Sequence, residues 1–142
     1  MPEESTTRDL VERTRILAAL FEPGNREDFD TMMSYFAPDA VWEVVALGTR
    51  LEGAAAIRGF FEDWRASYEQ FEIELEEIQD LGNGVGLTVM TQAGRLAGGT
   101  GHVRYRFAQI TTWADGVAIR VTGSPAIDEA QSAADRLAEE RG

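Results

Sequence analysis

The chain has 142 residues, a length typical of one domain with a single hydrophobic core. Its 25 acidic and 13 basic residues give a net charge of -12 at pH 7, which disfavours binding to nucleic acid or to an anionic membrane surface. It has no cysteine and one histidine, so disulfides, thiolate nucleophiles and Cys/His metal sites are excluded within one chain. We therefore expect no metal and no cofactor, and in the absence of a leader-like or membrane-spanning apolar run we expect a cytoplasmic protein.

Three helices are predicted in the N-terminal half. Thr6 opens the first, which ends at Pro23-Gly24, and Asn25 caps the second, which stops at Ala37-Pro38 because the residue before proline avoids the helical region. A third follows Gly53. The second and third helices each have one apolar face at helical spacing, formed by Phe29, Met32, Met33 and Phe36 and by Ile57, Phe60, Phe61, Trp64 and Tyr68.

Strands are predicted between and after these helices. Period-two patterns and turn residues place them at 41–47, 71–76, 85–92, 102–113 and 117–122. Residues 48–53 are rich in turn formers, Asn83-Gly84 and Asp115-Gly116 predict tight turns, and 94–101 predicts a glycine-rich hairpin. Residues 127–142 predict a short helical tail with only Ile127, Ala134 and Leu137 available to dock.

Three segments stand at fixed places in this order of elements: FAPDAVWE at 36–43, EG followed by AIRGFF within 52–61, and WADG at 113–116. Together they resemble the SnoaL-like and ketosteroid isomerase-like branch of the nuclear transport factor 2-like superfamily, over roughly residues 8–130. The resemblance implies an α+β cone, with three helices packed on a strongly curved, mostly antiparallel sheet. It also implies a single domain over 1–142, with 127–142 as a C-terminal helical tail.

The catalytic positions of ketosteroid isomerase can be carried onto this chain through the resemblance. The general base falls at Val44, the oxyanion-holding tyrosine near Leu20 and the protonated acid at Ala108. A Tyr-x-Asp pair that recurs on the last strand falls on Ser124-Pro125-Ala126. None of these side chains replaces the lost proton donors and acceptors, so we exclude steroid isomerisation by the family mechanism.

Either face of the 102–113 strand has features of an internal face. Periodicity makes Val103, Tyr105 and Phe107 a core face. The resemblance, counted from Ala108, instead turns His102, Arg104 and Arg106 into the cavity and leaves Tyr105, Phe107 and Trp113 on an outer face that serves a homodimer. We follow the resemblance, because a dimer interface would cover that apolar face.

Two classes of function follow. As a cofactor-free enzyme, the protein would be a cyclase, isomerase, lyase or hydrolase acting on a small apolar or anionic carbonyl compound, with His102 as acid or base and Arg104 and Arg106 binding negative charge. The alternative is a non-catalytic ligand-binding or dimeric scaffold protein, in which His102 is solvated and the arginines pair with Glu72, Glu74 or Glu76. In either case the predicted pocket walls are Trp42, Val44, Phe61, Trp64, Thr88, Met90 and Ala108. Glu43 is expected to be structural.

Overall fold

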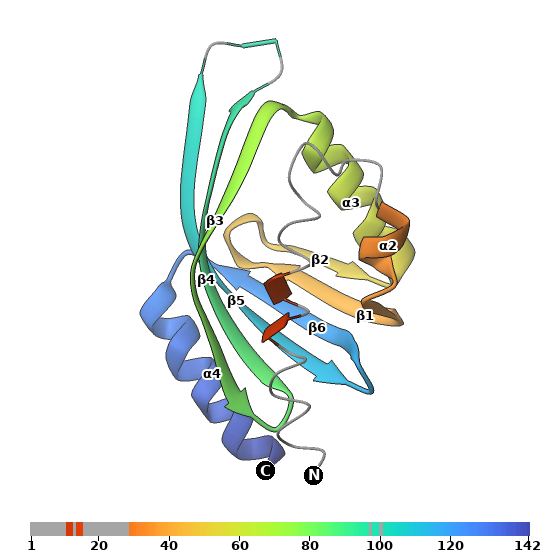
Figure 1. Ribbon diagram of the computed structural model, residues 1–142, viewed down its shortest axis with the longest axis vertical. Coiled ribbons are helices and arrows are strands. Elements are labelled where there is room, and N and C mark those ends of the chain that lie inside the picture. Colours follow the sequence, from red (N-terminus) through yellow and green to blue (C-terminus); the bar gives the residue numbers. More distant parts are fainter. Residues whose placement is uncertain (1–10, 13, 16–28, 97, 100) are drawn as a thin grey trace.

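The computed structural model describes residues 11–12, 14–15, 29–96, 98–99 and 101–142 of the chain. It is an α+β structure in which helices pack on both faces of a curled, open six-stranded sheet (Figure 1). The described helices are α2 (Phe29–Met33), α3 (Ala54–Ala66) and α4 (Ile127–Arg141). The strands are β1 (Phe36–Val44), β2 (Thr49–Glu52), β3 (Tyr68–Gly82), β4 (Val85–Leu96), β5 (His102–Ala114) and β6 (Val117–Ser124), and the 3₁₀ turn η2 (Val45–Leu47) joins β1 to β2.

The sheet has the order β2-β1-β6-β5-β4-β3. β1 pairs with β6 in parallel, and every other neighbouring pair is antiparallel. The two predicted tight turns are confirmed, because Asn83-Gly84 has φ values of 58° and 80° and Asp115-Gly116 has 53° and 84°. Left-handed conformations at both central residues are those of a type I′ hairpin, whose twist matches that of the flanking strands.

The concave face of the sheet faces α2 and α3, whereas α4 crosses the convex face (Figure 1). On the concave side a buried cluster joins Met32 of α2 and Ile57 and Phe61 of α3 to Trp42 and Trp113 of the sheet. A second cluster lies beneath α4 on the convex side. The sheet therefore has a separate apolar core on each face.

The C-terminal helix α4 docks along its full length. Ala130, Ala134 and Ala138, one turn apart, are buried against Val85, Leu87, Val89 and Ala108. The amides of Gln79 and Gln131 exchange hydrogen bonds of 2.9 and 3.1 Å, and the Asn83 amide donates to the Ala138 carbonyl at 2.6 Å. Arg141 Nε donates to the Asn83 carbonyl at 2.9 Å, so the end of the helix is held by the β3–β4 turn.

Two predictions about the N-terminal half are wrong, and a third lies outside the described residues. The second helix ends at Met33, because Phe36 already pairs with Ala118 of β6 and the Ala118 amide donates to the Tyr35 carbonyl at 2.7 Å. The segment 49–52, predicted as a turn, forms β2 against β1. In both places pairing with a neighbouring strand overrides the local pattern. The predicted first helix, between Thr6 and Pro23-Gly24, falls largely on residues that are not described.

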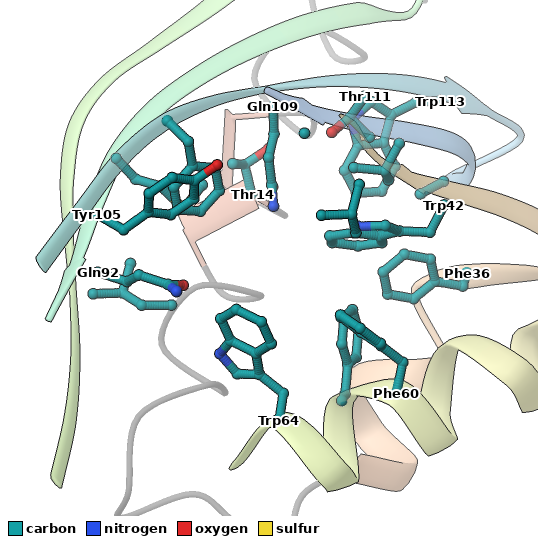
Figure 2. A pocket seen from close by; sticks show the side chains of 18 residues that line it. Thr14, Phe36, Trp42, Phe60, Trp64, Gln92, Tyr105, Gln109, Thr111 and Trp113 are labelled. Carbon is teal, nitrogen blue, oxygen red and sulfur yellow. The ribbon is translucent and has the colours of Figure 1, made fainter. Parts of the chain in front are cut away.

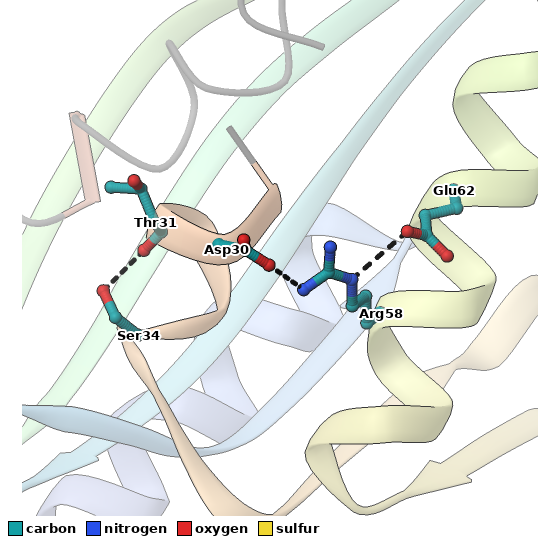
Figure 3. A network of polar contacts seen from close by, with 5 residues as sticks. All are labelled: Asp30, Thr31, Ser34, Arg58 and Glu62. Carbon is teal, nitrogen blue, oxygen red and sulfur yellow. Dashed lines mark hydrogen bonds and ion pairs between the residues drawn. The ribbon is translucent and has the colours of Figure 1, made fainter. Parts of the chain in front are cut away.

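A polar network joins α2 to α3 (Figure 3). The guanidinium of Arg58 bonds to Asp30 on α2 and, at 3.2 Å, to Glu62 one turn further along α3. The hydrogen bonds that Arg58 donates, to Asp30 first and to Glu62 second, raise the pKa of Arg58 above its usual value. Since exposed ion pairs contribute little free energy, the network mainly orients the two helices.

No helix in the described part of the chain is both long enough and apolar enough to cross a membrane.

Candidate ligand-binding pocket

A cavity of about 110 Å³ lies between the concave face of the sheet and α3 (Figure 2). One face of β5 supplies every second residue along its lining: Tyr105, Phe107, Gln109, Thr111 and Trp113. Successive residues of a strand point to opposite faces, so this set follows directly from the extended backbone. β4 adds Met90 and Gln92, which pair with Phe107 and Tyr105.

Aromatic rings form the wall opposite β5. Phe36 and Trp42 come from β1, and Phe60, Phe61 and Trp64 come from consecutive turns of α3. The rings of Trp42 and Phe61 meet edge to face, with centroids 4.8 Å apart and an interplanar angle of 87°, and Phe60 and Trp64 lie 5.7 Å apart. Such packed rings hold one another in place and leave a firm apolar surface.

The polar groups of the cavity are uncharged. The amides of Gln92 and Gln109 point into the space between the sheet and α3, where Thr111 and Tyr105 also lie (Figure 2). Gln92 is buried, at 7% exposure. Burial raises the pKa of the Tyr105 phenol, which therefore stays protonated at neutral pH. These groups can donate and accept hydrogen bonds, but they provide no charge.

Five of the seven predicted wall residues line the cavity, namely Trp42, Val44, Phe61, Trp64 and Met90. Thr88 is buried but lies outside the lining. Ala108 is fully buried on the opposite face, in the cluster beneath α4, so its assignment to the pocket is wrong. The small side chain at 108 lets the alanine stripe of α4 approach the sheet closely.

The three predicted catalytic residues also lie on the convex face. His102, Arg104 and Arg106 are exposed, and they alternate with the β5 residues that line the cavity. Arg106 Nε lies 3.0 Å from each oxygen of Glu76, whose carboxylate also accepts a 2.7 Å hydrogen bond from Thr91. These bonds lower the pKa of Glu76, the one from Thr91 most. This is the ion-pair alternative, confirmed for Arg106 with Glu76.

A shift of one residue explains the error. Because side chains alternate along a strand, counting one position off exchanges the internal and external faces of the whole strand. The apolar periodicity of Val103, Tyr105 and Phe107, taken alone, predicted the correct face. The same periodicity would have found Gln109, Thr111 and Trp113, which the sequence argument missed; Gln92 follows from its parity with Met90.

The face assignment also affects the predicted homodimer. Tyr105 and Phe107, which were expected to form an outer apolar interface, line the cavity with their rings stacked 5.1 Å apart. Beside α4 the convex face of β3 and β5 instead displays Glu72, Glu74, Arg104 and Arg106. The homodimer stays a prediction without that apolar surface as its support.

The positions that correspond to the family's catalytic groups have other roles here. Val44, at the position of the base, is an apolar part of the cavity wall. Glu43, next to it, faces away from the cavity and pairs with Arg120 on β6, in agreement with the structural role predicted for it.

The SnoaL-like domain model matches residues 17–121. The chain therefore belongs to the SnoaL-like family, in agreement with the resemblance noted in its sequence. A search of curated proteins finds no match.

Solved structures with the same fold include proteins of several descriptions. A putative SnoaL-like polyketide cyclase from Jannaschia sp. has a TM-score of 0.71 at 14% identity, with 90% of this chain and 92% of that chain covered. A hypothetical protein with a ketosteroid isomerase-like fold from Catenulispora acidiphila, in complex with trimethylamine, has a TM-score of 0.70 at 14% identity, covering 80% and 84%. An LEH-like epoxide hydrolase from M. tuberculosis has a TM-score of 0.68 at 18% identity, with 82% of this chain and 81% of that chain covered. At these identities the likeness concerns the fold.

Proposed function

We propose that this protein binds a small, uncharged and largely apolar molecule in the cavity, and that it does so without acid–base catalysis. The observation that carries the proposal is the chemistry of the lining. Among its 18 described residues there is no carboxylate, imidazole, ammonium or guanidinium. The one titratable side chain is Tyr105, whose raised pKa keeps it from serving as a base near neutral pH.

The composition of the cavity suits such a ligand. Apolar surface buried against the rings of Trp42, Trp64 and Phe60 supplies affinity at about 25 cal/mol per Å². A few convergent neutral groups, Gln92 and Gln109 among them, supply orientation, which is the usual division of roles in small-molecule sites. An unpaired anion or cation would lose its hydration without gaining a counter-charge.

The catalytic alternative is weaker. An acid–base enzyme of this family needs a proton acceptor that reaches the ligand, and the candidates His102, Arg104 and Arg106 lie on the convex face. Solved structures with the same fold include a putative cyclase and an epoxide hydrolase, so the fold itself is compatible with catalysis. In this chain the groups that could perform it are absent from the described lining.

A methylated amine is the second candidate ligand. Aromatic faces attract organic cations, and the cavity has several aromatic rings in a chain with a net charge of -12. The Catenulispora structure, moreover, is a complex with trimethylamine. An uncharged ligand is nevertheless favoured, because the described lining holds no carboxylate to offset the hydration that a buried cation would lose.

The test is a calorimetric titration with three probes of similar size: acetophenone, benzoate and phenyltrimethylammonium. All three tryptophans line the cavity, so intrinsic fluorescence gives a second readout. We expect acetophenone to bind more tightly than benzoate and to be recovered unchanged, as judged by mass spectrometry. Preference for benzoate, or conversion of a probe into a product, would overturn the proposal. Preference for phenyltrimethylammonium would select the second candidate.

A further inference from the structure

Gln92 is a polar side chain in an apolar part of the cavity lining. It is 7% exposed, and its amide points into the open space (Figure 2). Across the sheet it pairs with Ile73 on β3 and Tyr105 on β5, and the nearest residues on the same face of β4 are Met90 and Gly94. Of these four neighbours only Tyr105 has a polar side-chain group, a hydroxyl at the far end of its ring.

The packing of the sheet does not explain a glutamine at position 92. Burying an amide among apolar groups costs free energy, whereas a methionine of similar length would gain it. Gln109 on β5 differs, because it pairs with Thr88 and is followed on the same face by Thr111, so hydroxyl groups surround it. Residues that conflict with their packing environment are expected at functional sites. Of the two glutamines of the cavity, Gln92 is the one that meets this description.

The chemistry of an amide restricts what can pair with it. A glutamine side chain presents a carbonyl acceptor and an N–H donor side by side in one plane. A ketone accepts from the N–H group but leaves the carbonyl oxygen without a donor once water is displaced, which costs free energy in a buried site. A carboxylate would face that oxygen with like charge, and an ammonium would face the N–H group. A ligand with a donor and an acceptor next to each other satisfies both groups.

We infer that Gln92 orients the ligand by pairing with an amide of the ligand, a carboxamide or a lactam, through two parallel hydrogen bonds. The inference rests on the proposed function and names the polar group of its ligand. The rest of the ligand is an apolar ring. Trp64 of α3 lies on the side of the cavity that faces Gln92, so its indole is the surface on which that ring packs (Figure 2). Tyr105 is held beside Gln92 by its stacking on Phe107.

The experiment compares benzamide with acetophenone, which has nearly the same shape and a methyl group in place of the N–H donor. Both are titrated calorimetrically into the full chain and into Gln92→Met, which removes both hydrogen-bonding groups of the side chain. One additional hydrogen bond corresponds to about fivefold in affinity, so we expect the unsubstituted protein to prefer benzamide by about this factor. We expect Gln92→Met to weaken benzamide binding about fivefold more than acetophenone binding, so that the preference disappears. Comparing two ligands in one variant cancels changes in the shape of the wall.

Gln109→Met is the matched control, because it makes the same change elsewhere in the lining of the same cavity. We expect it to alter the binding of the two probes by the same factor and to leave the preference for benzamide in place. A preference that survives Gln92→Met, or that disappears in Gln109→Met instead, would overturn the assignment to Gln92.

Gln92→Glu tests the pairing through a gain of binding, which loss of the fold cannot mimic. A carboxylate presents only acceptors, and its complement is an amidinium, which presents two donors. We expect Gln92→Glu to bind benzamidine more tightly than benzamide, whereas the unsubstituted protein has the opposite preference. Retained preference for benzamide in Gln92→Glu would overturn the pairing.

The unsubstituted protein alone separates this inference from the proposed function. If benzamide and acetophenone bind to it equally well, the role of Gln92 fails while the proposed function stands. If neither probe binds, both fail.

Discussion

Arg106 and Glu76 are joined across the convex face of the sheet, with Arg106 Nε 3.0 Å from both carboxylate oxygens, while Phe107, the next residue, lines the cavity on the other face. One strand therefore holds an ion pair on one side and a candidate ligand-binding wall on the other. Stability and ligand binding should respond separately to substitutions at neighbouring positions of β5.

The Glu76 carboxylate should make stability depend on pH. Hydrogen bonds from Thr91 and Arg106 lower its pKa in the folded state, so its contribution is fully present above the pKa of the unfolded chain and is lost as the pH falls through the folded value. We expect Glu76→Gln to lower the unfolding midpoint in urea at pH 7, with the difference from the unsubstituted protein disappearing in acid. Glu74→Gln removes the same charge from the same strand and serves as the control. Equal effects of the two substitutions at pH 7 would contradict a specific role for Glu76.

Residues on the two faces of the sheet should differ in their effect on binding. His102→Ala and Arg104→Ala alter exposed convex side chains, so we expect acetophenone affinity within about twofold of the original, since surface substitutions away from a site change free energies by about 0.5 kcal/mol or less. Gln92→Ala removes a buried amide of the cavity, and we expect a loss of about fivefold. Calorimetric titration of the three variants is the measurement. If His102→Ala weakens acetophenone binding and Gln92→Ala leaves it unchanged, the face of β5 that carries His102 is the one that lines the cavity.

An acid introduced at Val44 should convert binding into a pH-dependent process. The side chain at 44 faces an apolar cavity, and desolvation there raises the pKa of a carboxyl group. We expect Val44→Asp to bind acetophenone weakly at pH 8, where the carboxylate is charged, and more tightly at pH 5. Val44→Asn, similar in shape and uncharged, should show no such change. Titrations of both variants at the two pH values decide the question, and a flat pH profile in Val44→Asp would argue that residue 44 faces solvent.

Gly84 should tolerate no side chain. Its φ of +80° is unfavourable for other residues, and a Cβ atom would lie 2.5 Å from the Trp113 carbonyl oxygen, which belongs to the backbone and cannot rotate away. We expect Gly84→Ala to lower the free energy of unfolding by more than about 2 kcal/mol. Gly48→Ala is the control, because Gly48 has a φ of +61° and open space around the added Cβ. We expect it to lose only the free energy that the left-handed backbone costs an alanine, about 1 kcal/mol. Urea unfolding of the two variants measures the difference, and equal losses would mean that the β3–β4 turn relaxes.

The docking of α4 should depend on small side chains. Ala134 is fully buried against the convex face and Ala133, its neighbour, is exposed. Forcing a larger side chain into a packed interface costs about 1–3 kcal/mol, so we expect this loss in Ala134→Leu and almost none in Ala133→Leu. Thermal unfolding is sufficient to compare them. A stable Ala134→Leu variant would indicate that α4 is not held against the sheet in solution.

Much of the fold was predictable because it depends on local chemistry. Asn83-Gly84 and Asp115-Gly116 predicted their turns, and the stripe of Ile57, Phe61 and Trp64 predicted the helix that forms the aromatic wall. The failures occur where a distant strand decides the outcome. Phe36 continues the helical stripe in sequence but pairs with Ala118, which no local pattern reveals.

The candidate site was predictable to a lesser extent for a related reason. Trp42, Phe61 and Trp64 were recognisable as wall residues because large aromatic side chains on an apolar face must be buried. Gln92, Gln109 and Thr111 were not, since their role depends on which face of the sheet is hollow. The face of the sheet that is hollow also decides where Tyr105 lies. For this residue the alternation of apolar side chains along β5 predicted the correct face, whereas the residue positions carried over from the family did not.

The parallel pairing of β1 with β6 also affects how the protein is made. Trp42 is adjacent to Val121 in the sheet although most of the chain separates them in sequence. Since synthesis proceeds from the N-terminus, a nascent chain that has not yet reached Val117 has Trp42 and Val44 without the strand that pairs with them. The cavity is thus completed late, the apolar β1 stays available to wrong partners until then, and folding is expected to be slow for a domain of this size.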